Sequence, residues 1–198
     1  MATKYGFSDV RKALAEDLKS AYPTKLEDHE RTKVLGEDFF GLPKPHPNAV
    51  LNLFTEHNVK FALPFAAYRA GLGGPSVLAS ERPGTALPRL TLASIIHGIG
   101  GMRRTVVYAA ATAYTYDLAT CLEKGCILNT PGGRVEVWKK IFIVMARKSQ
   151  GDMLSPLSFE NLCTGCAKFF KDHHRDCCKR FVWAELPGLI GLESWEGI

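Results

Sequence analysis

The sequence predicts a mainly α protein, an irregular helical domain with a small cysteine-rich, zinc-stapled C-terminal part. Apolar residues recur at helical spacing in several stretches, whereas no stretch alternates strictly between apolar and polar residues. No Asn-Gly or Asp-Gly hairpin turn occurs. All six cysteines follow residue 120. We therefore expect a helical region over residues 1–118 and a cysteine-bearing helical subdomain over residues 119–198.

The N-terminal stretch GFSDVRKALAEDLKSAYP is the first predicted helix. Ser8 or Asp9 can accept hydrogen bonds from the free N–H groups of its first turn, and Pro23 ends it. The apolar positions on one face are Val10, Leu14 and Leu18. A loop is expected at residues 39–48, because its three prolines fix φ and remove backbone donors.

Two further helices are predicted after this loop. Pro47 and Asn48 open the first of them. Its inner face consists of Val50, Leu51 and Phe54. The stretch ALPFAAYRAGLGG forms the second, which begins near Pro64. The glycines that end it are Gly71, Gly73 and Gly74. Residues 75–89 then indicate a loop with at most one helical turn.

Helical spacing returns in LTLASIIHGIGG, which places apolar residues at i, i+3, i+4 and i+7. These residues are Leu92, Ile95, Ile96 and Ile99. Gly100 and Gly101 are expected to end or bend this helix, and residues 102–122 continue as a helix of small residues. A last amphipathic helix is predicted in GRVEVWKKIFIVMARKS. Its apolar residues are Trp138, Ile141, Phe142 and Met145.

Composition limits the class of protein. With 46% hydrophobic residues, the 198-residue chain is globular rather than disordered. The net charge of +5 comes from scattered basic residues, which favours a solvated surface over a phosphate-binding stripe. The N-terminus is charged from Lys4 onward, and no run approaches ~18 apolar residues, so neither a signal peptide nor a membrane span is predicted. We expect a cytoplasmic or nuclear protein with reduced or metal-bound cysteines.

Two close cysteine pairs indicate a structural zinc site. CLEKGC is a C-x4-C pair, and CTGC is a C-x2-C pair. In each pair a glycine, Gly125 or Gly165, precedes the second cysteine and permits the backbone angles that a metal-binding turn requires. Structural zinc is tetrahedral and is often held by four thiolates. The predicted ligands of Zn²⁺ are Cys121, Cys126, Cys163 and Cys166.

Other interpretations of the cysteines stay open. Free cysteine is among the most buried residue types, so these residues also suit a hydrophobic core; redox sensing and disulfide formation are further alternatives. The stretch HHRDCC offers alternative ligands in His173, His174, Cys177 and Cys178. Adjacent cysteines rarely reach one tetrahedral metal, so at most one of Cys177 and Cys178 should bind. The two histidines can equally be exposed polar residues of a charged segment.

No motif indicates an enzyme. A Cys/His hydrolase needs a thiol, a base and an orienting group in one cleft, and nothing in the sequence brings such groups together. His97 lies in an apolar segment, where a core or helix-end position is expected. The stretch AGLGGP follows a predicted helix, so it is not the strand-to-helix turn of a dinucleotide site. A Cys-dependent enzyme is therefore kept only as a second alternative.

One stretch near each end of the chain carries a family resemblance. ATKYGFSDVRKALAEDL follows the form L-A-x-K-Y-x-F-x-x-V-R, and LCTGCAK…KRFVWAELPGLIGLESW has a C-x-x-C before W-x-x-L-P and G-L-x-x-W. The matching C-terminal residues are Cys163, Cys166, Trp183, Leu186, Pro187, Gly191, Leu192 and Trp195. Both stretches resemble fungal, mushroom-type BTB/POZ domain-containing proteins. The BTB core of that family is expected before Thr3, so the chain resembles the helical region after the core.

This resemblance implies an interaction module, since some BTB proteins bridge cullin ubiquitin ligases to their substrates. In that family, dimerisation and cullin contact belong to the BTB core, which we expect this chain to lack. We therefore expect a non-enzymatic protein–protein interaction module with a structural zinc site. A ubiquitin-ligase component is one candidate partner. The alternative is a nucleic-acid-binding zinc protein, which the pI near 8.9 permits, although nucleic acid is not the expected partner.

Overall fold

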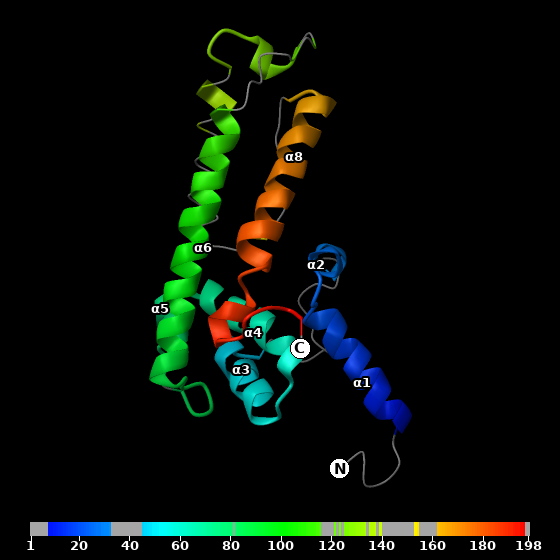
Figure 1. The fold of residues 1–198 in the computed structure, drawn as a ribbon, viewed down its shortest axis with the longest axis vertical. Helices are drawn as coiled ribbons and strands as arrows, with labels where there is room; N and C mark the ends of the chain where they lie inside the picture. The colour runs from blue at the N-terminus through cyan, green and yellow to red at the C-terminus, as the bar shows by residue number, and fades with distance from the viewer. Residues whose placement is uncertain are drawn as a thin grey trace. The chain divides into compact units, whose positions relative to one another are not determined.

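A computed structural model of the chain is built from helices, and no strand occurs among the residues it describes (Figure 1). The described residues are 8–32, 45–80, 82–115, 121, 123, 125–133, 135–137, 139, 153–154 and 162–196. The predicted mainly α fold class is therefore confirmed. None of the described helices combines the length and the apolar character that a membrane span requires.

The chain forms two compact units. Unit 1 consists of Met1–Ile96 together with Leu186–Ile198, and unit 2 consists of His97–Glu185. The domain boundary that we predicted near residue 118 falls outside the described residues and stays a prediction.

Unit 1 contains most of the described helices. They are α1 (Ser8–Ala21), α2 (Leu26–Thr32), α3 (Pro47–Glu56), α4 (Leu63–Leu72) and α5 (Gly74–Leu78), with the 3-10 turns η1 (Lys60–Ala62) and η4 (Pro187–Ile190). The sequence predicts α1, α3 and α4, and α5 is the single turn expected after them. Helix α2 was not predicted, because its sequence LEDHERT has almost no apolar residues to form a pattern.

Helix α4 is the centre of unit 1, where it packs against α3, α5 and η4. Phe65 and Tyr68 supply buried aromatic rings. Small residues beside these rings let the neighbouring helices approach closely. These are Ala66, Ala67 and Ala70, and all are buried. The helix runs through Gly71, which we expected to help end it. The chain then turns at Gly74, whose φ of +77° is strained for residues other than glycine.

Aromatic contacts connect the first two helices of unit 1 to this centre. The ring of Tyr22 lies edge-on to Phe54 at 4.8 Å and to Phe65 at 6.3 Å between centroids. His29 lies 5.0 Å from Phe65, and the Arg69 guanidinium lies 6.0 Å from the Tyr22 centroid. Burial raises the pKa of Tyr22, and the charge of Arg69 opposes this only in part. Each such aromatic pair stabilises the fold by about 0.5–1.5 kcal/mol beyond its buried area.

Two asparagines, one turn apart on α3, hold the end of α5 and the loop that follows it. The fully buried amide of Asn48 donates, at 3.0–3.1 Å, to the carbonyl groups of Val77, Leu78 and Thr85. The exposed amide of Asn52 donates to the carbonyl groups of Gly84 and Ala86. Val50, Leu51 and Phe54 form the buried face of α3 as predicted. The helix starts at His46, whose Nδ1 accepts from the backbone N–H of Asn48 at 3.3 Å.

Helix α6 (Arg89–Thr115) begins in unit 1 and continues into unit 2. It runs through Gly100 and Gly101, so of the two outcomes that we expected at these glycines, an end or a bend, the end does not occur. The helical segments before and after the two glycines are long, and because helix propagation is cooperative they outweigh the low helix propensity of glycine. Ile95 and Ile99 are buried as expected, but Ile96 is 46% exposed.

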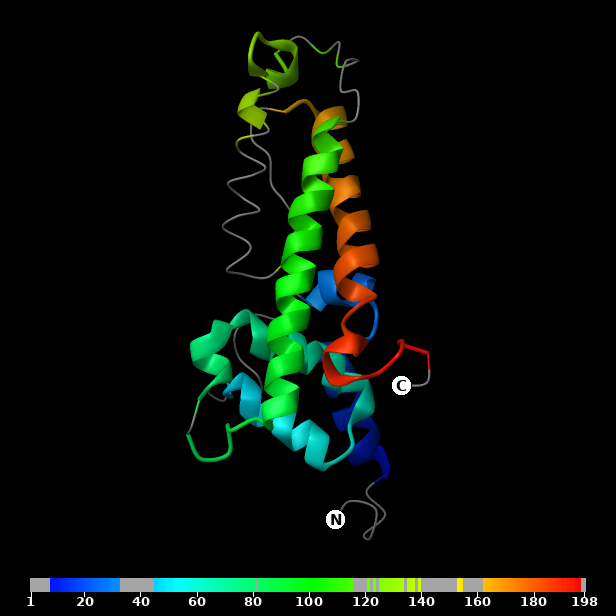
Figure 2. The same ribbon diagram turned by 60° about the vertical axis from the view of Figure 1, so that its left-hand side comes forward.

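Unit 2 contains the second part of α6, the 3-10 turn η2 (Ile127–Asn129), α8 (Thr164–Cys178) and the π-helical turn η3 (Lys179–Trp183). In Figures 1 and 2, α8 lies beside the C-terminal part of α6 and runs in the opposite direction. The buried residues of α8 are Phe170, His174, Cys177 and Cys178. Those of this part of α6 are Ile99, Met102 and Val106.

Two predicted helix faces are only partly described. On α1, Leu14 is 48% exposed and Leu18 is half-buried, so the predicted apolar face is wrong at Leu14. The side chain of Val10 lies outside the description. In the predicted helix at 133–149, the described residues 133, 135–137 and 139 are helical. Its predicted apolar residues Trp138, Ile141, Phe142 and Met145 lie outside the described residues.

Candidate metal centre

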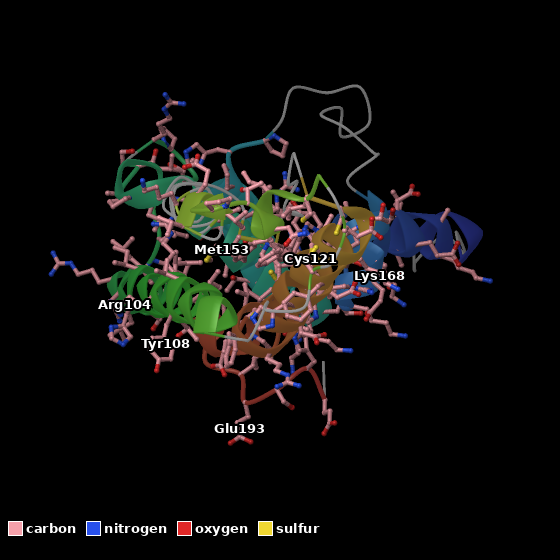
Figure 3. All side chains as sticks on the ribbon, turned by 90° about the horizontal axis from the view of Figure 1, so that it is seen from above. Arg104, Tyr108, Cys121, Met153, Lys168 and Glu193 are labelled. Atoms are coloured by element: carbon pink, nitrogen blue, oxygen red, sulfur yellow. The ribbon has the colours of Figure 1, made fainter. Side chains whose placement is uncertain are left out.

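Four of the six cysteines of the chain converge in unit 2. Their Sγ atoms all lie within 4.8 Å of one another. These are Cys121, Cys126, Cys163 and Cys166, which are the four ligands that the sequence predicts. In Figure 3, Cys121 lies near the N-terminal part of α8, where Lys168 is labelled. The cluster therefore joins the chain around η2 to the start of α8.

The turn of CLEKGC is set by Gly125. This residue has φ +98°, in a region that residues with a side chain rarely adopt. It brings the N–H of Cys126 to the carbonyl of Glu123 at 3.2 Å and directs the chain into η2. The expected role of Gly125 is confirmed.

The turn of CTGC has a different basis. Cys163 is the N-cap residue of α8, with extended backbone angles, and Cys166 lies in the first helical turn. Gly165 is helical and has no positive φ, so our expectation that it opens a glycine turn is wrong. A helix start already places positions i and i+3 on one side, and so directs both thiols together.

Backbone N–H groups point at two of the sulfurs. The N–H of Cys163 donates to Sγ of Cys126 at 3.5 Å, and the N–H of Leu128 also bonds to this sulfur. The N–H of Glu123 bonds to Sγ of Cys121. Such donors stabilise thiolate charge and fix the direction of each sulfur. These donors to the sulfurs are backbone N–H groups, which every residue except proline has, so no residue pattern in the sequence identified them.

The spacing of the sulfurs fits a tetrahedral metal. Zinc–sulfur bonds of ~2.3 Å place the sulfurs of a tetrahedron about 3.8 Å apart. The Sγ atoms of Cys121 and Cys163 lie 3.6 Å apart, and the widest pair of the four needs a contraction of only about 1 Å to reach that value. The six cysteines are free thiols. A disulfide would require a separation of ~2.05 Å, so the cluster has the dimensions of a metal site rather than of a disulfide.

The thiols of the cluster shift one another's pKa in opposite directions. Burial raises the pKa of Cys126, but the N–H groups of Cys163 and Leu128, together with the thiols of Cys121 and Cys163, outweigh it and lower the pKa to about 7. Burial and the neighbouring thiols raise the pKa of Cys166. The N–H of Glu123 lowers the pKa of Cys121, but desolvation and two neighbouring thiols raise it overall. Four adjacent thiolates therefore repel one another, and a divalent cation at their centre would remove that repulsion.

The stretch HHRDCC does not belong to this cluster. Cys166 and His173 are seven residues apart on one continuous helix, which places them about 10 Å apart along its axis. The Sγ of Cys177 lies 3.5 Å from Nε2 of His173, and the Sγ of Cys178 lies 3.2 Å from Nδ1 of His174. These i, i+4 pairs form part of the packing of α8. The group whose ligand atoms meet contains none of these four residues, so they are not alternative ligands of the four-cysteine site.

Two further expectations about single residues are corrected. The four clustered cysteines are not simply small core residues, because only Cys126 is buried and the other three are half-buried. His97 is exposed in the interior of α6, and so it occupies neither a core nor a helix-end position.

Comparison of this chain with known protein families, curated proteins and solved structures finds no match. The geometry of the site is therefore the basis for interpreting its chemistry. The resemblance to fungal BTB proteins rests on the sequence motifs alone.

Proposed function

We propose that this chain is a non-enzymatic protein–protein interaction module whose unit 2 is held together by one structural Zn²⁺ ion. The observation that supports this most directly is the convergence of four cysteine sulfurs within 4.8 Å. Soft thiolate ligands in a tetrahedral set favour zinc over magnesium or calcium, which prefer oxygen ligands.

The ligand set favours a structural over a catalytic role. Catalytic zinc sites keep one position open for water or substrate, whereas four thiolates close the coordination sphere. The ion would connect the turn at Cys121 and Cys126 to the first turn of α8. These segments are distant in the sequence. The ion would therefore connect them in the way that a hydrophobic core otherwise does.

Metal analysis of the purified chain tests the zinc proposal. We expect about one zinc per chain, and loss of that zinc in Cys163→Ser together with the protection of α8 from hydrogen exchange. Cys177→Ala is the matched control, because it removes a thiol of α8 that lies outside the cluster. The control should keep its zinc. Metal-free wild-type protein with unchanged stability would contradict the proposal.

The interaction role rests on the BTB-like motifs and on exposed apolar side chains. Leu90 is 84% exposed and Tyr108 is 72% exposed, both on α6. Figure 3 shows Tyr108 and Arg104 on this helix. The proposed partner is a protein, for which a ubiquitin-ligase component is the first candidate, and the proposed location is the cytoplasm or the nucleus.

A binding assay with purified ubiquitin-ligase components tests this role. We expect saturable binding to the full chain that the double variant Leu90→Ser/Tyr108→Ser weakens at least tenfold. Lys168→Ser, an exposed change on α8, serves as the control. Equal binding by all three proteins would show that these side chains are not the contact. Absence of binding to any component would remove the ubiquitin-ligase candidate.

A nucleic-acid-binding zinc protein is the second candidate. Helix α8 exposes Lys168 and Lys171 within one turn, and Lys179 continues the same side. Asp172 and Asp176 lie between these cations and reduce the local positive charge. Affinity for duplex DNA that falls steeply with salt would support this candidate, and its absence at low salt would exclude it.

A further inference from the structure

The chain passes between its two compact units at two places. One lies inside α6, between Ile96 and His97, and the other lies between Glu185 and Leu186. Any change in the relative orientation of the units must therefore be accommodated by α6 and by the segment that follows α8.

The first crossing coincides with a cluster of glycines. Gly98, Gly100 and Gly101 follow the boundary within five residues, in the interior of a 27-residue helix. No contact with a described residue accounts for the two glycines Gly100 and Gly101. Among the residues that the structure describes, a Cβ atom at Gly101 would meet nothing within 4 Å, and one at Gly100 would meet only the end of the Arg104 side chain at 3.9 Å. Alanine would fit beside these described neighbours and is a far better helix former.

The second crossing follows a stretch of irregular helix. Helix α8 ends at Cys178 and continues as the π-helical turn η3, in which the N–H of Ala184 bonds to the carbonyl of Lys179 five residues back. A turn then leads into the 3-10 helix η4. π-helical turns are rare and are, with glycine pairs, among the few identified causes of helix bending.

We propose that these two crossings form a hinge, at which α6 bends through Gly98–Gly101 while η3 changes its local helical form. Glycine weakens the helix at the first crossing because it exposes the backbone and gains the most freedom when a turn opens. The wide turn of η3 can tighten to an α-helical turn, which adjusts the length and direction of the second connection. The hinge lets the two units change orientation while each keeps its own core, and it does not depend on metal binding.

The decisive variant is the double substitution Gly100→Ala/Gly101→Ala in the full chain. We expect the amides of residues 98–105 to exchange faster in the wild type than those of residues 91–96. In the variant their exchange should slow by about 25-fold, from ~1 kcal/mol per glycine and 1.4 kcal/mol per tenfold change. Ala93→Gly is the control, since it places a glycine at an exposed position of the same helix within unit 1. It should speed exchange only around residue 93.

Distances between the units test the motion itself. Fluorophores attached through non-natural amino acids at the exposed positions Glu56, in unit 1, and Lys168, in unit 2, leave all cysteines free. We expect a broad single-molecule distance distribution in the wild type and in Ala93→Gly, and a clearly narrower one in the double alanine variant. An equally narrow distribution in all three proteins would overturn the hinge. Slower exchange without any change in the distribution would also overturn it, because the glycines would then act only locally.

Discussion

The two units of this protein reach a folded state by different chemistry. Unit 1 is free of cysteine and packs aromatic and small residues around α4, with amide hydrogen bonds from α3 fixing its loop. Unit 2 brings four thiols together at one end of α8, and the apolar face that is described along that helix is short. On the zinc proposal, this difference teaches that one chain can combine an ordinary hydrophobic core with a region whose order depends on a bound ion.

The largest expected effect is on unit 2 alone. Removal of the metal with a strong chelator should abolish hydrogen-exchange protection in α8, because structural zinc contributes ~10–16 kcal/mol in small metal-dependent folds. Protection of α3 and α4 should change little. Hydrogen exchange with mass spectrometry measures both regions in one experiment. Equal loss of protection in both units would contradict the distinction between them, since it would show that they unfold together when the metal is removed.

The next prediction concerns unit 1, which a substitution that shortens a buried core side chain should destabilise. Leu51 is 1% exposed, so Leu51→Ala should lower the free energy of unfolding of unit 1 by about 2–5 kcal/mol. Leu53, which is 51% exposed on the same helix, offers a matched control, and Leu53→Ala should change it by about 0.5 kcal/mol or less. Denaturant unfolding provides the measurement. Both variants should still bind one zinc, and loss of the metal in Leu51→Ala would contradict independent units.

A smaller effect is expected from the asparagines of α3. Asn48→Ala leaves three carbonyl groups, two of them in buried hydrogen bonds, without this donor and should destabilise unit 1 by about 2–3 kcal/mol. Asn52→Ala exposes its two acceptors to water and should cost about 0.5–1 kcal/mol. Thermal unfolding of the two variants side by side measures the difference. Equal unfolding temperatures of the two variants would show that burial of the Asn48 amide does not make its hydrogen bonds more stabilising than those of Asn52.

The smallest effects are expected from alanine substitutions of the glycines in the two cysteine turns, CLEKGC and CTGC, and these effects should differ between the turns. Gly125→Ala introduces a side chain at φ +98° and should cost about 1–3 kcal/mol, which weakens zinc binding. Gly165→Ala lies in the first turn of α8, where no described atom stands within 4 Å of the added Cβ, and it should be neutral or stabilising by up to about 1 kcal/mol. Competition with a chromogenic zinc chelator measures both affinities. Equal losses would mean that both turns need glycine.

Local signals explain which helices the sequence predicts. Helix α3 has a proline at its first position and three apolar residues at helical spacing, so its start and its buried face follow from the sequence. Helix α2 has no such pattern. It is held by long-range contacts, since Leu26 is buried at 2% exposure and His29 lies against Phe65 of α4. In α6 the sequence left open whether Gly100 and Gly101 end or bend the helix, and the helix continues because the cost of each glycine is small beside the packing of a long helix.

The sequence predicted which four cysteines meet in the candidate site. It did not predict the backbone conformation that brings them together. Paired spacings identify Cys121, Cys126, Cys163 and Cys166, because close cysteines on one turn can reach a common ion. The exclusion of HHRDCC depended on the continuity of α8, which carries those residues away from the cluster. The helical state of Gly165 likewise became visible only in three dimensions.

The missing cap of α8 has a consequence for how the protein is made. Cys163 occupies the N-cap position, but its side chain makes no capping hydrogen bond to the first turn. On the zinc proposal, the ion orders this helix end in place of a serine or aspartate. Cys121 and Cys126 leave the ribosome well before the other two ligands, so α8 is completed only when all four meet one ion. The cellular supply of zinc would then set the yield of finished protein, and chains made during zinc shortage would present α8 to proteases as an unfinished segment.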